Sequence, residues 1–169
     1  MHGVGAYLRG VTLFVAGIVV GTILMQPSRA QEKRTPLRLN HVGIAVNDYQ
    51  GSYDFYTKVM GFKVAFKFPP TADGKPTTTY FQISKDTFLE MAPASEQMPA
   101  GITHMGIETT DAKATVMDLR AAGAHVEDVR VSGPTKANLS NIYGPDHIRL
   151  EIIELTPDSL HKKAEDSWK

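Results

Sequence analysis

The sequence contains one pattern of residues twice, with about 60 positions between the copies. His41, Gly43, Ile44 and Asp48 correspond to His104, Gly106, Ile107 and Asp111, each 63 positions further along the chain. Glu90 and Glu151 continue the correspondence at a distance of 61, a drift that a short loop deletion produces. A repeat of this length indicates one supersecondary unit used twice, with each copy too small to bury its own sheet face.

Hydrophobic periodicity predicts the same order of elements in both copies. In the first copy, Tyr49, Tyr53, Tyr56 and Met60 share one face of a helix that Gly61 ends, and their expected role is core packing. Alternating apolar residues predict the strands. The expected strands are 39–46, 62–68, 77–84 and 87–91, then 102–109, 125–131, 138–143 and 148–155, with the second helix at 111–122. The fold class is therefore α+β, with two tandem βαβββ modules at 37–98 and 101–157.

The first 30 residues have the layout of a secretory signal. Arg9 precedes an apolar run over 11–25 that is shorter than the roughly 20 residues of a membrane span, and Ser28 and Ala30 suit cleavage before Gln31. An uncleaved N-terminal anchor is the alternative. Either reading predicts an exported domain, periplasmic or extracellular, after a polar linker at 31–36. Residues 158–169 are expected to form a charged C-terminal tail, in which a short helix is possible.

Composition excludes several classes of function. Lysine plus arginine equals aspartate plus glutamate at 18 each, and no basic stripe with interleaved aromatics indicates nucleic-acid binding. The chain has no cysteine, which removes disulfides, thiolate nucleophiles and zinc-thiolate sites. Any metal must therefore bind nitrogen and oxygen donors.

Each copy offers one histidine early in its first strand and one glutamate in its last strand. Glu90 and Glu151 alternate with apolar neighbours, so both are expected on the face opposite the core residues of their strands. A buried carboxylate needs a partner, and a cation supplies one. The predicted ligands of one divalent metal ion are His41, Glu90, His104 and Glu151, with zinc, nickel, cobalt, manganese or iron(II) compatible with this set. Any one of these residues taken alone is more simply a strand-edge or solvent-facing residue.

Five segments resemble the vicinal oxygen chelate superfamily, which includes glyoxalase I, the bleomycin-resistance proteins and the extradiol dioxygenases. They are LNHVGI at 39–44, SYDFY at 52–56, MGF at 60–62, ITHMGI at 102–107 and YGPDHIRLE at 143–151. The resemblance implies paired modules that form a U-shaped open mixed sheet with the metal in its cup. It also implies the ligand set His41, Glu90, His104 and Glu151. Assembly as a homodimer is expected.

In this superfamily the metal polarises a small-molecule substrate that carries two adjacent oxygens, which stabilises an enolate. A base must remove the proton next to the carbonyl, and the candidate catalytic residues are Glu151 and Glu90, with Glu151 preferred. The resemblance therefore implies a glyoxalase-like lyase or an epimerase-like isomerase acting on a small oxygenated metabolite. Glutathione is not the expected substrate, because Ala45, Ala94 and Ala100 stand where glyoxalase I has arginine, asparagine and arginine.

Two alternatives come from other classes of function. A non-catalytic small-molecule binding protein of the bleomycin-resistance kind shares the fold but typically lacks these ligands. An extradiol dioxygenase uses two histidines and one glutamate on iron(II), so Glu90 counts against it.

The other histidines are expected outside the ligand set. His125 falls in an edge-like strand, His147 in a turn and His161 in the tail. Tyr143, Arg149 and Lys136 could line the cup.

Overall fold

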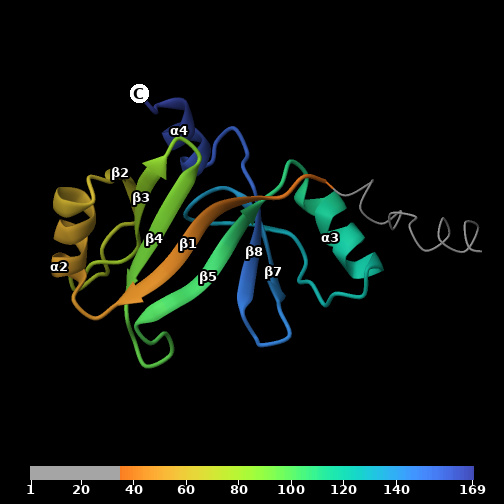
Figure 1. The fold of residues 1–169 in the computed structure, drawn as a ribbon, viewed down its shortest axis with the longest axis horizontal. Coiled ribbons are helices and arrows are strands. Elements are labelled where there is room, and N and C mark those ends of the chain that lie inside the picture. Colours follow the sequence, from red (N-terminus) through yellow and green to blue (C-terminus); the bar gives the residue numbers. More distant parts are fainter. Residues whose placement is uncertain (1–34) are drawn as a thin grey trace, which may run out of the picture. The chain divides into compact units, whose positions relative to one another are not determined.

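An eight-stranded mixed sheet organises residues 35–169, the part of the chain that this computed structural model describes (Figure 1). The strand order is β2-β3-β4-β1-β5-β8-β7-β6. The strands are β1 (Arg38–Val46), β2 (Lys63–Lys67), β3 (Thr79–Ser84), β4 (Thr87–Pro93), β5 (Gly101–Glu108), β6 (Arg130–Val131), β7 (Asn138–Tyr143) and β8 (Arg149–Glu154). The helices are α2 (Tyr49–Asp54), α3 (Ala112–Ala121) and α4 (Leu160–Asp166). The predicted α+β class with an open mixed sheet is confirmed.

The signal or anchor predicted for residues 1–30 lies outside the described residues, as does most of the linker predicted at 31–36. Within residues 35–169, no helix is long and apolar enough to cross a membrane.

The two modules meet at a pair of antiparallel strands, β1 and β5. On either side of this seam the same arrangement recurs, because β1 pairs in parallel with β4 and β5 pairs in parallel with β8. The first and last strands of each module are therefore neighbours. This topology brings the histidine strand and the glutamate strand of each copy to the centre of one sheet.

The first module has apolar contacts on both faces of its strands. On the outer face, Phe81, Leu89 and Met91 pack against the aromatic residues of the first helical segment. The other face, here called the inner face, carries Tyr80 and Phe88 together with Ala164 of α4. Tyr49, Tyr53 and Tyr56 thus lie against the core, as their spacing predicts, whereas Met60, which was expected with them, is 50% exposed.

Three elements differ from the sequence-based prediction. The helix expected at 49–60 changes after Asp54 to a π-helical turn, Phe55–Val59. The strand expected at 125–131 is wrong except for Arg130–Val131 and one bridge at Val126. The Arg120 guanidinium donates to the Val126 carbonyl at 2.7 Å, at the same residue that forms the bridge to Ile142 of β7.

The third difference is the C-terminal segment. Within the charged tail predicted at 158–169, residues 160–166 form a short helix, α4, which Ser159 caps by accepting a hydrogen bond from the Lys162 amide. His161 and Ala164 are buried on this helix. A short, charged segment with few apolar residues gave little signal for this packing.

An aspartate caps each module's helix in the same way. Asp48 accepts a hydrogen bond from the Gly51 amide and Asp111 from the Ala114 amide, both at 2.9 Å. The repeat therefore preserves the position of helix initiation as well as the strand order. An N-cap carboxylate satisfies an amide that has no partner within the helix.

Asp111→Ala should lower the free energy of unfolding by about 1 kcal/mol, because the Ala114 amide then loses its acceptor. Urea denaturation followed by circular dichroism measures this difference. Lys113→Ala, an exposed change in the same turn, is the control and should alter stability by much less. Equal effects of the two substitutions would contradict a capping role.

Candidate metal centre

The two imidazoles face each other across the β1–β5 seam. The strand register pairs His41 with Gly106 and His104 with Gly43. A Cβ atom built on Gly106 would lie 2.1 Å from His41 Cε1, and one built on Gly43 would lie 2.1 Å from His104 Cε1. Each glycine therefore provides the space that the other module's imidazole occupies. This explains why the His-x-Gly pattern occurs in both copies.

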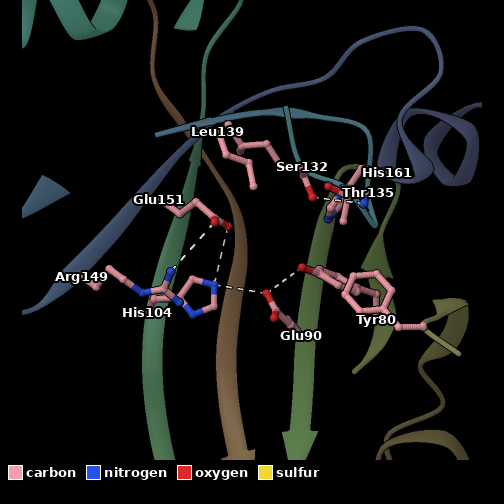
Figure 2. Close-up of a pocket in the computed structure, with 11 residues that line it drawn as sticks. Tyr80, Glu90, His104, Ser132, Thr135, Leu139, Arg149, Glu151 and His161 are labelled. Carbon is pink, nitrogen blue, oxygen red and sulfur yellow. Dashed lines mark hydrogen bonds and ion pairs between the residues drawn. The ribbon is translucent and has the colours of Figure 1, made fainter. Parts of the chain in front are cut away.

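The four predicted ligands converge on one point of the inner face. His41 Nε2 and His104 Nε2 lie 3.0 Å apart. Glu90 Oε2 lies 3.5 Å from His41 Nε2 and 3.2 Å from His104 Nε2. Glu151 Oε2 lies 3.4 Å and 3.8 Å from the same two nitrogens. Figure 2 shows Glu90, His104 and Glu151 directed toward one another from three different strands.

Hydrogen bonds behind His41 determine which of its nitrogens is free. The Asn40 amide nitrogen donates to Glu108 at 2.9 Å, so its oxygen is the atom that lies 2.9 Å from His41 Nδ1. That oxygen can only accept, which places the imidazole proton on Nδ1. His41 Nε2 then presents a lone pair toward the two carboxylates. Arg38 completes this chain of contacts with a 2.7 Å ion pair to Glu108.

The donor set fits a divalent cation. Donors bound at about 2.1 Å are about 3.0 Å apart at a right angle, about 3.4 Å apart in a tetrahedron and about 4.2 Å apart when opposite. The nitrogen–nitrogen distance of 3.0 Å and the nitrogen–oxygen distances of 3.2–3.8 Å fall within this range, whereas the 4.8 Å limit over all four ligand atoms exceeds it by about 0.6 Å. When His41 is neutral, its Nε2 lone pair faces two carboxylate oxygens, which is repulsive unless a metal ion or a proton lies between them. Two imidazoles and two carboxylates are ligands for zinc and for other first-row divalent ions.

Ionisation of Glu90 is determined by opposing effects. Burial alone would raise the pKa of Glu90, but the hydrogen bond from His104, the nearby charges of both histidines and the hydrogen bond from Tyr80 lower this pKa to about 2. The Tyr80 hydroxyl donates to Glu90 Oε2 at 2.7 Å. Burial is the main effect that raises the pKa of the Tyr80 hydroxyl, and the negative charge of Glu90 raises it further. Tyr80 therefore remains a neutral donor that holds a charged carboxylate in place.

A cavity of about 170 Å³ opens beside the four ligands. Glu90, His104 and Glu151 line it, together with Arg149, whose Nη1 lies 4.0 Å from Glu151 Oε1. The lining is completed by Phe68, Tyr80, Ser132, Thr135, Leu139, Ile153 and His161. The volume exceeds that of an engineered cavity of roughly 150 Å³ that holds one benzene molecule. A small metabolite or the reacting end of a larger one fits this space.

The sequence-based predictions for the remaining residues have mixed outcomes. Arg149 lines the cavity, whereas Tyr143 and Lys136 are not among its lining residues. His125 and His147 are exposed, in agreement with their expected place outside the ligand set. His161 was placed in a tail, and this is wrong, because the residue is fully buried and lines the cavity. In the sequence, the only indication of this burial is a histidine in a short segment that carries few apolar residues.

The sequence and the fold both match known proteins. Residues 38–152 match the family described as the Glyoxalase/Bleomycin resistance protein/Dioxygenase superfamily. The chain belongs to this superfamily. A curated relative, the uncharacterized protein YwkD of Bacillus subtilis, is 22% identical over 69% of this chain and 95% of its own length.

Solved structures of the same superfamily have the same fold. The methylmalonyl-CoA epimerase of Mycobacterium tuberculosis superposes with a TM-score of 0.59 at 21% identity, over 70% of this chain and 88% of that chain. The 2,3-dioxygenase LapB of Pseudomonas sp. KL28 has a TM-score of 0.60 at 14% identity, over 70% of this chain and 42% of that chain. An isomerase and a dioxygenase thus share this superfamily fold, which by itself does not determine the reaction.

Gly106→Ala should reduce metal retention by roughly 10- to 100-fold, because the added methyl group would occupy the position of the His41 ring. Metal content per folded protein, measured by elemental analysis after dialysis against a weak chelator, tests this. Gly144→Ala is the matched control, since its Cβ would meet only the Ile148 carbonyl at 3.7 Å. Equal metal content in the two variants, or no metal in the parent protein after reconstitution, would contradict the assignment.

Proposed function

We propose that this protein is a metal-dependent isomerase or lyase that removes a proton next to the carbonyl of a small carboxylic acid. The observation that carries the proposal is the convergence of two imidazoles and two carboxylates at one wall of a small cavity that a guanidinium also lines. His41, Glu90, His104 and Glu151 would hold a divalent ion. When bound, this ion would act as a Lewis acid toward adjacent oxygens of the substrate.

Arg149 supports a carboxylate as part of the substrate. A divalent ion would balance the charges of Glu90 and Glu151, which leaves the guanidinium charge for an anion. Arg149 has a 3.3 Å hydrogen bond to Asn141 and a 4.0 Å contact with Glu151, both longer than an ideal charge-assisted bond. Its planar fork of donors matches the geometry of a carboxylate. A 2-oxo acid or 2-hydroxy acid provides this group next to a second oxygen.

Glu151 is the favoured base. Glu90 is held by the Tyr80 hydroxyl, through the same oxygen that lies nearest His104. Glu151 instead directs Oε2 toward His41 and Oε1 toward Arg149 on the cavity wall. It can therefore accept a proton from a substrate carbon at one oxygen and return it to the same or an adjacent carbon. Delivery of a proton to the opposite face of the same carbon gives an epimerase, and expulsion of a neighbouring group gives a lyase.

Burial of the reacting groups supports this chemistry further. His41 is fully buried, and His104 and Glu151 are nearly so. Limited access of water strengthens the electrostatic interactions that stabilise a developing oxyanion.

Glu151→Gln should slow exchange of substrate protons by roughly 100-fold or more, because glutamine can still offer an oxygen to a metal but cannot take the proton. Exchange at C3 of 2-oxobutyrate in deuterated water, followed by proton nuclear magnetic resonance, measures this step without knowledge of the product. Glu90→Gln is the matched variant and should retain more exchange. An unchanged rate in Glu151→Gln, with metal still bound, would rule out Glu151 as the base.

Arg149→Gln should weaken the binding of oxalate to the metal-loaded protein by about tenfold, because a charge-assisted pair is lost. Isothermal titration calorimetry measures the dissociation constant, with metal content checked in every sample. Arg130→Gln replaces an exposed arginine of β6 and should leave the constant unchanged. If both substitutions weaken binding alike, the effect comes from overall charge and Arg149 does not bind the carboxylate.

A further inference from the structure

His161, which lines the cavity, is unusual because its ring nitrogens are buried without a hydrogen-bond partner. Its side chain has no exposed surface, and neither Nδ1 nor Nε2 has a hydrogen-bond partner. These two atoms are the only buried side-chain nitrogens or oxygens without a partner among residues 35–169. Buried polar atoms are almost always paired, because an unpaired one retains the full cost of leaving water.

The surroundings of His161 would suit an apolar ring better. Phe66, Tyr80 and Phe88 lie nearly perpendicular to the imidazole, with ring centroids 4.8–5.1 Å away. Ala164 belongs to the same cluster through Tyr80 and Phe88. Stability alone would therefore favour phenylalanine or leucine at this position. An imidazole carries at least one N–H donor, so His161 can donate to a ligand oxygen.

The position of His161 relative to the metal centre suggests what its partner is. Its ring stacks on the His41 ring at 5.8 Å with an interplanar angle of 22°. It lines the same cavity as Glu90, Glu151 and Arg149. A molecule bound through oxygens at the metal centre would extend toward His161 within a few bonds.

Two hydroxyl groups lie at the same end of the cavity. Ser132 and Thr135 line it beside His161, away from Arg149 and His104 (Figure 2). Ser132 Oγ accepts a hydrogen bond from the Thr135 amide at 3.1 Å, so its own proton is available to donate. The Leu160 amide donates to the Thr135 carbonyl at 2.9 Å, which attaches the start of α4 to this loop. Loop and helix therefore form one polar wall.

We propose that His161 is a substrate-binding residue, which hydrogen-bonds a second polar group of the substrate at the α4 end of the cavity. This inference rests on the proposed function and adds to it a two-ended substrate. One end has vicinal oxygens for the metal and Arg149, and the other has a carboxylate or carbonyl for His161 and Ser132. Binding would require the His161 ring to turn until a nitrogen meets the substrate, a rotation about a torsion that is soft in histidine.

Two probe ligands separate this contact from the metal centre. Oxalate carries only the vicinal oxygens, whereas 2-oxoglutarate has vicinal oxygens and a distal carboxylate. Calorimetric titration of the metal-loaded full chain with each probe gives two dissociation constants for every variant. The variants are His161→Phe and His161→Leu, which are apolar, and His161→Asn, which keeps hydrogen-bonding groups. His125→Phe repeats the first change at an exposed histidine.

The apolar variants should bind 2-oxoglutarate at least tenfold more weakly and oxalate within about twofold of the parent, because only the distal contact is lost. His161→Asn should recover part of the loss, and His125→Phe should match the parent. If His161→Phe does not fold, His161→Leu gives the same comparison.

Other outcomes overturn the inference in distinguishable ways. Equal weakening of both probes would mean that His161 only supports His41 and the metal centre. Unchanged affinity for both probes would mean that the ring contacts no ligand, and so would a parent protein that binds oxalate but not 2-oxoglutarate. A metal-loaded parent that binds neither probe would overturn the proposed function and this inference with it.

Discussion

The close contact between each imidazole and the glycine of the opposing strand is the constraint on which the rest of the centre depends. His41 lies over Gly106, and His104 lies over Gly43, with no space for a Cβ atom at either glycine. Each imidazole lies over the opposing glycine only because β1 and β5 pair in antiparallel orientation, and this pairing joins two copies of one module. Once the seam forms, the parallel partners β4 and β8 bring Glu90 and Glu151 to the same face. The four donors therefore converge because of strand register and need no specialised loop.

One part of the inner face is packed and contributes stability, and the other part forms the cavity beside the metal centre. Over the first module, α4 covers Tyr80 and Phe88 and excludes water from the back of the metal centre. Toward the second module the same face remains open as the cavity that Arg149 and Ser132 line. Arg38 connects the two parts, because its guanidinium contacts Glu165 of α4 at 3.3 Å and Glu108 at 2.7 Å, and Glu108 binds Asn40 behind His41. The C-terminal helix is thus part of the site's framework.

The sequence predicted most of the sheet and all four members of the donor cluster, because both depend on local alternation repeated in two copies. Glu90 stands between Leu89 and Met91, and that alternation alone placed its carboxylate opposite the core. The strand at 125–131 was predicted too long: it is reduced to Arg130–Val131 and a bridge at Val126, whose carbonyl also accepts a hydrogen bond from Arg120, a contact without a periodic pattern. His161 was missed because its burial comes from long-range packing against β2, β3 and β4, which a seven-residue helix does not reveal.

The sequence by itself determined the duplication, the βαβββ order of each copy and the residue types that a nitrogen- and oxygen-liganded metal needs. These features follow from composition and from the alternation of neighbouring side chains, and neither depends on contacts between distant parts of the chain. Only the tertiary structure decided the distances between donors, the proton position on His41, the presence of Arg149 in the cavity and the burial of His161. Each of these depends on contacts between residues far apart in the chain, and such contacts exist only when the strands are paired and α4 is packed against them.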